Sequence, residues 1–146
     1  MRLALLRPGS LEGGMVPRAV ANVTEVAGVL PLHSTGVGKV FLAFSADPEV
    51  RAILDAASLR RYTARTITHP GLLASEVSVI RNVRIGYSRG EMTAGTASAA
   101  APVFDAEGGL VAALGVLAPE AEQVDRLAPE VRRAADAISR HLRPGR

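Results

Sequence analysis

Hydrophobic positions along the chain follow two spacings, one typical of strands and one typical of helices. Short apolar runs bounded by turn residues predict strands at residues 2–7, 15–20, 22–26, 85–89, 97–104 and 110–117. The last two runs are joined by residues 105–109, and the glycines of this Asp-Ala-Glu-Gly-Gly segment suit the positive φ angles of a hairpin turn. We therefore expect a long hairpin in the second half of the chain.

Apolar residues three and four positions apart predict helices between these strands. A first helix is expected over 35–44, with Ser34 or Thr35 as its N-cap. A second begins at Asp47 and Pro48, an N-cap followed by a residue suited to the first helical position. It should run to about residue 56, because the chain then becomes polar and irregular.

Two further helices follow. Thr68 is the predicted N-cap of the third, whose buried stripe should comprise Leu72, Leu73, Val77, Ile80 and Val83. The apolar face of a long C-terminal helix should comprise Leu127, Val131, Ala134, Ala135, Ile138 and Leu142. Strands, helices, more strands and a closing helix predict an α+β domain, with an antiparallel sheet and helices packed on it.

Composition narrows the class of protein. A length of 146 residues suits a single domain, 1–146, and a hydrophobic fraction of 48% suits a packed core. The chain has no cysteine, which excludes disulfides, thiolate metal sites and thiol catalysis. No apolar run reaches the roughly 18 residues needed to cross a membrane, and the apolar start at 1–6 is too short for a signal sequence. We expect a cytoplasmic protein.

The net charge of +3 is the one feature that points toward nucleic acid. Basic residues are scattered singly or in pairs among carboxylates, however, and no helix-turn-helix pattern precedes the first strand. Direct DNA binding by this chain alone is not expected.

The junction at residues 30–39, Leu-Pro-Leu-His-Ser-Thr-Gly-Val-Gly-Lys, is the most informative segment. A strand stops at Pro31 and a helix begins within a few residues, which places backbone N–H groups at a helix start where a small anion can bind. Gly36 and Gly38 allow a ligand to approach the main chain. We expect unpaired amides at Gly36 and Val37, facing a hollow.

Four segments, in this order and spacing, resemble the effector-binding domain of IclR-type transcriptional regulators. They are GVLPLHSTGVGK at 28–39, YTARTIT at 62–68, AAPVFD at 100–105 and VAAL at 111–114. The resemblance covers residues 2–142. It implies a GAF-like fold, with a curved antiparallel sheet flanked by helices, a long C-terminal helix and a pocket on the concave side of the sheet.

The resemblance also implies a function. Such a domain senses a small organic effector, an acid or aromatic compound, assembles as a homodimer or tetramer, and controls transcription through an N-terminal winged helix. We expect no DNA-binding domain in this chain, since its first residues already match the first strand of the family domain. The segment between Gly14 and Gly28 is shorter than is usual in the family, and the spacing from Gly86 to Glu91 is about two residues shorter.

By the same resemblance, the effector would contact Gly36 and Val37 at the helix start, and Thr96 and Ser98 on the following hairpin. Strand alternation puts residues 96 and 98 on one face. Gly115 and Leu117 stand where members that bind small keto acids have serine, so we expect a larger or less polar effector than glyoxylate or pyruvate. The remaining candidate lining residues are Ser88 and Asn22. In each case packing is the alternative to ligand binding.

Four other polar side chains are candidates for a role. His33 is expected to be structural rather than a base. Arg65 ties its loop to the sheet or pairs with a carboxylate, and Glu91 is either a solvated charge or a lid residue. Lys39 is expected at the surface or paired with a carboxylate. No spacing of His, Asp and Glu suits a metal, and no cofactor motif is present.

Catalysis is not expected, because the chain lacks a Gly-x-Ser-x-Gly elbow, a P-loop and a dinucleotide fingerprint. The alternative function is of another class: a stand-alone interaction module that dimerises with a full-length regulator. The identity of the effector, the sign of regulation and the operator are not encoded in any motif. A start-site artefact is a third explanation for the missing winged helix.

Overall fold

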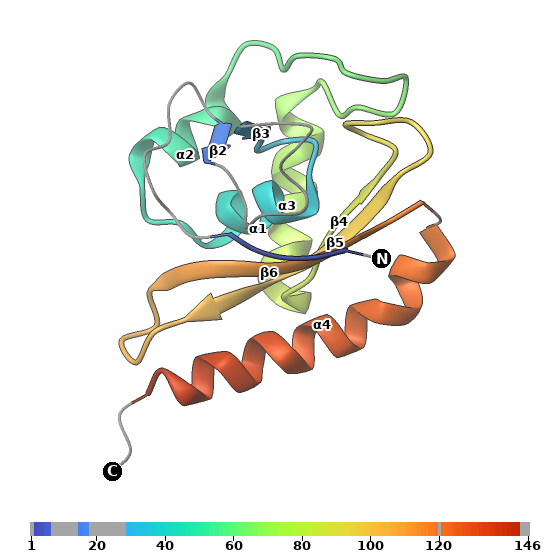
Figure 1. The fold of residues 1–146 in the computed structure, drawn as a ribbon. Coiled ribbons are helices and arrows are strands. Elements are labelled where there is room, and N and C mark those ends of the chain that lie inside the picture. Colours follow the sequence, from blue (N-terminus) through green and yellow to red (C-terminus); the bar gives the residue numbers. More distant parts are fainter. Residues whose placement is uncertain (1, 7–14, 18–28, 120, 144–146) are drawn as a thin grey trace.

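A four-stranded antiparallel sheet forms the centre of the molecule (Figure 1). The computed structural model describes residues 2–6, 15–17, 29–119 and 121–143. The strands lie in the order β1 (Arg2–Leu6), β6 (Leu110–Ala118), β5 (Ala97–Phe104) and β4 (Gly86–Arg89). The predicted hairpin is therefore confirmed as the middle of the sheet.

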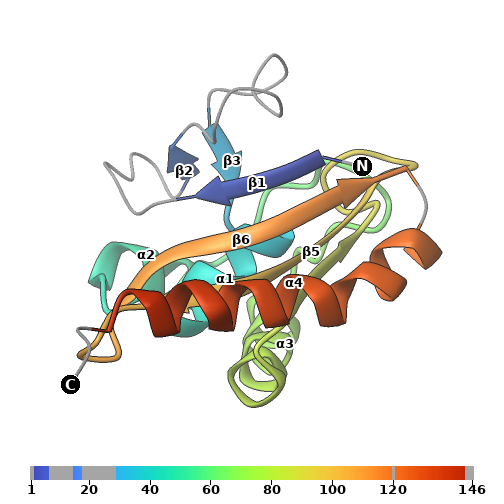
Figure 2. The same cartoon turned by 60° about the horizontal axis from the view of Figure 1, so that its bottom comes forward.

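A separate two-stranded ribbon pairs β2 (Met15–Pro17) with β3 (Val29–Pro31). The prediction of strands at 15–20 and 22–26 is confirmed only for the first three of these residues, because residues 18–28 lie outside the described part of the chain. Figure 2 shows the ribbon beyond β1, on the side of the sheet away from the long C-terminal helix.

Helices cover both faces of the sheet. On one face lie α1 (Gly36–Phe44), α2 (Pro48–Ala52) with the 3₁₀ turn η1 (Ile53–Asp55), and α3 (Pro70–Val83). The opposite face is covered by α4 (Ala121–His141), which runs across β5 and β6 (Figures 1 and 2). The α+β class and the long C-terminal helix are thus confirmed.

Strand alternation divides the core into two halves. Ala99, Ala101 and Val116 pack with the buried face of α4, whereas Ala100 and Ala113 pack with α1 and α3. Alanine dominates the face of β5 toward α4, where Ala97, Ala99 and Ala101 let the helix approach the sheet closely. This explains how a chain with only 3% aromatic residues builds a dense interior.

The helix caps follow the sequence with one exception. Thr35 and Asp47 are N-caps as predicted, their side chains accepting from the N–H groups of Gly38 and Glu49. The N-cap of α3 is His69 and not Thr68, because Nδ1 of His69 accepts from the Gly71 N–H at 3.1 Å.

The predicted apolar stripe of α3 is partly wrong. Leu73, Val77 and Ile80 are buried, but Leu72 is 65% exposed and Val83 45% exposed. Only the first three share the side of α3 that faces α1, while Leu72 lies about 100° further around the helix. For the C-terminal helix the prediction is confirmed at Val131 and Ala135, which are buried, and at Leu127 and Ile138, which pack half-buried against the core. It is wrong for Ala134 and for Leu142, which lies just beyond α4, because both are exposed; the buried positions of α4 are Val124, Ala128, Val131, Ala135 and Ser139.

Candidate functional site

The first turn of α1 rests directly on strands β4 and β5. The Gly36 N–H donates to Oγ of Ser98 at 3.1 Å. A Cβ atom at Gly36 would lie 2.9 Å from the carbonyl oxygen of Gly86, so only glycine fits this contact. The prediction of an unpaired amide is therefore wrong for Gly36, because Ser98 reaches it from the sheet. Close packing of helix and sheet explains this glycine.

The rest of the turn is capped from within the chain, with two exceptions. Oγ1 of Thr35 accepts from the Gly38 N–H at 3.0 Å and donates to the Pro31 carbonyl at 2.8 Å. Among the described residues, the Val37 N–H has no acceptor. The buried Ser34 hydroxyl likewise has no hydrogen-bond partner there. Two polar groups at this helix start are thus left without partners.

The sheet brings most of the candidate residues to this point. Ser88, Ser98 and Leu117 lie opposite one another on β4, β5 and β6. Gly115, two residues before Leu117, lies on the same face. The Ser88 hydroxyl donates to the Ser34 carbonyl at 2.8 Å, so Ser88 also links β4 to the strand–helix junction.

Gly115 does not leave an open space. A Cβ atom there would lie 3.0 Å from Cγ1 of Val37, so the Val37 side chain fills the volume that a serine would enter. Leu117 remains half-buried on the same face. The apolar character predicted for this wall is therefore provided by Val37 and Leu117 together.

Two candidates lie elsewhere. Thr96 is on the same face as Ser98 but lies just before the first residue of β5, where its hydroxyl donates to the Thr93 carbonyl at 2.8 Å. It lines a cavity of about 370 Å³, the sheet-end cavity, with Thr63, Arg65, Arg89, Gly90 and Ala121 among the other lining residues. Asn22 is outside the described residues.

Lys39 forms a buried ionic cluster that sequence reasoning missed. Its side chain is fully buried, with Nζ 3.0 Å from Oε1 of Glu76 and 2.7 Å from Oε2 of Glu91. Pairing with a carboxylate is confirmed, but Glu91 is neither a solvated charge nor a lid residue. Lys39 is the one charged residue in the apolar helix sequence GVGKVFLAF, and that position is the signal that could have revealed its burial.

His33 and Arg65 complete the candidates. Nε2 of His33 lies 2.8 Å from the Arg60 carbonyl oxygen, and its ring lies 5.7 Å from the ring of Tyr62. These contacts tie the strand–helix junction to the loop before α3, in agreement with a structural role. Arg65 is exposed, and although its backbone N–H donates to Oγ1 of Thr63, its guanidinium makes no hydrogen bond or ion pair with the described residues, so neither predicted role is supported.

Within the described part of the chain, no three His, Asp or Glu side chains gather closely enough to hold a metal ion. None of the described helices is long and apolar enough to cross a membrane. The site at the start of α1 is thus made of amides, hydroxyls and apolar side chains, a combination suited to holding a small polar molecule.

Comparison with known proteins decides the family. Residues 15–140 match the family model of the bacterial transcriptional regulator IclR C-terminal domain. The chain belongs to the IclR family. The Escherichia coli regulator KdgR is 37% identical to it over 89 residues, which are 61% of this chain and 34% of KdgR. The chain spans between 29% and 51% of the length of the curated relatives that it matches, and these relatives are named as regulators.

Solved structures of IclR-type domains have the same fold. The C-terminal domain of KdgR superposes with a TM-score of 0.76 at 28% identity, covering 96% of this chain and 86% of that domain. The inducer-binding domain of Acinetobacter PobR was solved as a double mutant with 3-hydroxybenzoic acid. It superposes with a TM-score of 0.75 at 23% identity, and the match covers 94% of this chain and 86% of that domain. The α+β architecture is therefore that of the IclR C-terminal domain.

Proposed function

We propose that this chain is the effector-sensing and oligomerising part of an IclR-type regulator, and that a small organic acid binds at the start of α1. The observation that carries the proposal is a pair of polar groups there that have no partner among the described residues, the Val37 N–H and the Ser34 hydroxyl. A buried polar group without a partner costs free energy, and a ligand that supplies the missing hydrogen bond offsets that cost.

The chemistry of this site favours a carboxylate. The N–H groups of a helix start carry the positive end of the helix dipole, which attracts an anion. Ser98 accepts from Gly36 through its oxygen, and its own hydroxyl hydrogen is left to donate to a ligand. Leu117 and Val37 add apolar surface. The effector should therefore combine a carboxylate with an apolar or aromatic body, as 3-hydroxybenzoic acid does in the complex of PobR.

Calorimetric titration of the 146-residue chain tests this assignment. The panel comprises 3-hydroxybenzoate, other aromatic and branched-chain acids, pyruvate and glyoxylate. We expect an apolar acid to bind more tightly than pyruvate, and Ser98→Ala to weaken that binding by about tenfold, because a hydrogen bond to a charged group is lost.

Ser139→Ala is the matched control. Oγ of Ser139 accepts from the Phe104 N–H at 3.0 Å, much as Ser98 accepts from Gly36, but Ser139 lies on α4 at the opposite face of the sheet. Both variants lose the acceptor of a backbone N–H, and only Ser98→Ala should lose affinity. Absence of binding across the panel, or equal weakening in both variants, contradicts the site.

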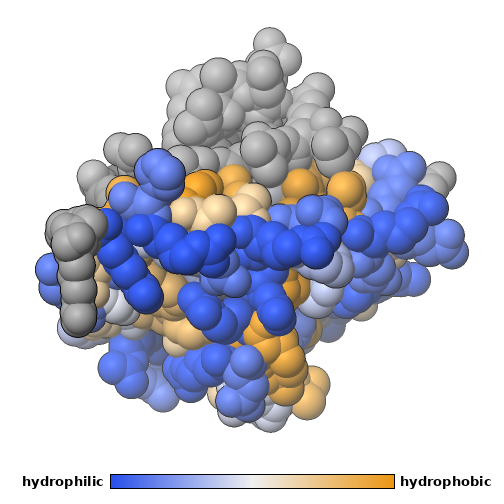
Figure 3. Space-filling model, turned by 90° about the horizontal axis from the view of Figure 1, so that it is seen from below, coloured by the Kyte–Doolittle hydropathy of each residue, from blue (hydrophilic) through white to orange (hydrophobic). Residues whose placement is uncertain are grey.

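Oligomerisation is part of the same proposal. Leu72, Val79 and Val83 are exposed on the outer side of α3, and Figure 3 shows hydrophobic surface beside the hydrophilic band of α4. Light scattering should give a dimer or tetramer, and a strictly monomeric chain contradicts it. Co-purification with a full-length relative, in place of self-association, would favour the interaction module instead.

In a complete regulator, effector binding would shift the domain between two arrangements and thereby alter DNA affinity.

A further inference from the structure

The sheet-end cavity is separate from the start of α1. It is bounded by the loop at residues 63–65, the end of β4, the start of β5 and the start of α4. Thr96 is the only candidate effector residue among its described lining residues. We propose that this cavity is a second ligand site, which binds a small organic anion through a carboxylate or phosphate group.

The charge of the lining carries this proposal. Arg65 and Arg89 both line the cavity, and no carboxylate is among its described lining residues. The Arg89 guanidinium is paired with Asp125, whereas the Arg65 guanidinium has no ion-pair partner among the described residues, and an anion in the cavity would supply one. Their planar arrays of N–H donors match the oxygen geometry of carboxylates and phosphates.

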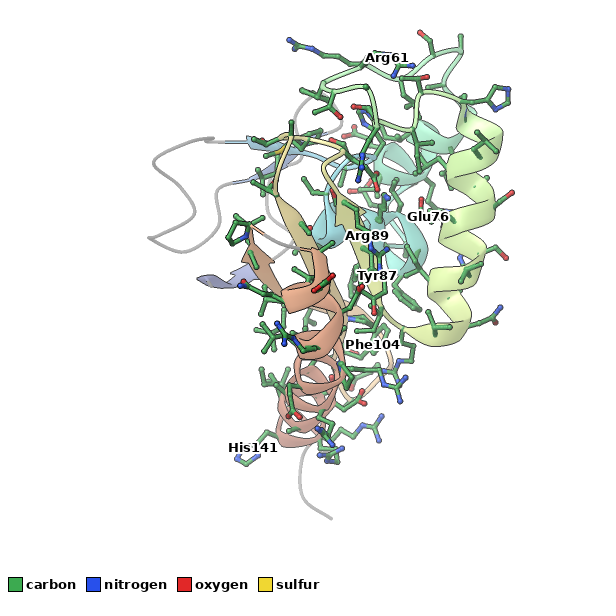
Figure 4. The ribbon with its side chains drawn as sticks, turned by 90° about the vertical axis from the view of Figure 1, so that its right-hand side faces the viewer. Arg61, Glu76, Tyr87, Arg89, Phe104 and His141 are labelled. Carbon is green, nitrogen blue, oxygen red and sulfur yellow. The ribbon has the colours of Figure 1, made fainter. Side chains whose placement is uncertain are left out.

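The Arg89 guanidinium is held in a fixed position by two contacts. Its Nη2 donates to Oδ1 of Asp125 at 2.6 Å, and its guanidinium lies 4.3 Å from the centre of the Tyr87 ring. Figure 4 shows Arg89 and Tyr87 next to each other on β4. One Nη2–H group donates to Asp125, so the remaining N–H groups of the guanidinium are available to a ligand.

Arg65 provides the uncompensated charge. Its guanidinium makes no hydrogen bond or ion pair with the described residues, and its side chain passes over Gly90, where a Cβ atom would lie 3.4 Å from Cδ of Arg65. The wall beneath it is fixed, since the Thr63 hydroxyl donates to the Gly90 carbonyl at 2.6 Å. The cavity is therefore preformed, with one oriented cation and one free cation.

Size and polarity define the ligand further. A volume of about 370 Å³ lies at the small end of the range for metabolite sites. Ala64, Ala97 and Pro119 provide a short apolar surface beside the arginines. The ligand should thus be a compact anion with a short carbon body.

NMR titration of the 146-residue chain with two probes, inorganic phosphate and succinate, at constant ionic strength tests the proposal. We expect saturable shifts of the Gly90, Gly95 and Thr96 amides with at least one probe. Saturation by phosphate alone assigns a phosphate ligand, and saturation by succinate alone assigns a carboxylate. Saturation by neither overturns the proposal. Arg65→Ala should weaken binding by about tenfold, because a charge-assisted hydrogen bond is lost.

Arg126→Ala is the control for loss of charge alone. Arg126 is exposed on α4 and does not line the cavity. Equal weakening in both arginine variants overturns the proposal. Ala94→Glu, at an exposed lining position, should abolish binding by placing a carboxylate beside the arginines, and unchanged binding would count against it. Ser98→Ala should leave this titration unaffected, so failure here and failure of the α1 site are separate results.

Discussion

Lys39 and Glu91 form an ion pair, with Nζ 2.7 Å from Oε2, that closes the open edge of β4. The Gly90 N–H donates to the Thr96 carbonyl of the β5 side at 2.7 Å. Because every second residue of an antiparallel strand points its backbone groups at the partner strand, the Tyr87 carbonyl points away from β5. The Lys39 ammonium donates to that carbonyl at 2.9 Å. The edge strand is therefore covered by side chains and cannot readily pair with another chain.

The same ammonium joins α1 to α3. Oε1 of Glu76 accepts from Lys39 at 3.0 Å, and Figure 4 shows Glu76 on the side of α3 that faces the sheet. The hydroxyls of Thr63 and Thr66 donate to the carbonyls of Gly90 and Glu91 at 2.6 Å each. The start of α1 and the wall of the sheet-end cavity are thus mechanically linked through one buried lysine.

Removing the Lys39 ammonium should be strongly destabilising. In Lys39→Met the carboxylate of Glu91 stays buried without its cationic partner, so we expect a loss of about 3–5 kcal/mol in the free energy of unfolding. Urea denaturation measures this. The double variant Lys39→Met/Glu91→Gln should recover part of the loss, since no buried charge is left unpaired. A single variant within about 0.5 kcal/mol of the parent would show that the cluster contributes little.

Gly36 should not tolerate a side chain. In Gly36→Ala the new Cβ lies 2.9 Å from the Gly86 carbonyl oxygen and 3.0 Å from Oγ of Ser98, so α1 must move away from the sheet. We expect about 1–3 kcal/mol of destabilisation, measured by thermal unfolding. Gly71→Ala is the matched control near the start of α3, because its Cβ meets only the His69 ring. Similar stability of the two variants contradicts the contact.

The Thr35 cap should affect stability and effector binding together. Thr35→Ala removes the acceptor of the Gly38 N–H and the donor to the Pro31 carbonyl, which should cost about 1–2 kcal/mol. Fraying of the first turn should also weaken any ligand held by the Val37 N–H. Thr35→Ser retains the hydroxyl and should restore both properties. If Thr35→Ser behaves like Thr35→Ala, the methyl group and not the cap is responsible.

Truncating the two adjacent leucines of α3 should change the free energy of unfolding by very different amounts. Leu73 is fully buried whereas Leu72 is 65% exposed. Leu73→Ala should lose about 2–5 kcal/mol through lost burial and a cavity, and Leu72→Ala about 0.5 kcal/mol or less. Denaturant unfolding at low protein concentration compares them. Equal losses would mean that a further surface covers Leu72.

The start of α1 was only partly predictable from the sequence. The Pro-Leu-His-Ser-Thr-Gly pattern predicts the cap, the helix and a polar site, because each depends on neighbouring residues. Pairing of the Gly36 amide with Ser98 is not predictable in this way, since Ser98 lies 62 residues further along the chain. The filling of the space over Gly115 by Val37 likewise depends on how a helix and a strand approach each other.

The sequence by itself determined most of the described secondary structure, because hydrophobic periodicity, the Thr35 and Asp47 caps and the glycine turn of the hairpin act over a few neighbouring residues. Only the tertiary structure decided which apolar and charged side chains are buried. Leu72 is exposed because α3 packs on its other side, and Lys39 is buried because Glu76 and Glu91 arrive from distant segments to neutralise it. Burial depends on the partners that folding brings together, and the spacing of residue types along a short segment does not predict those partners.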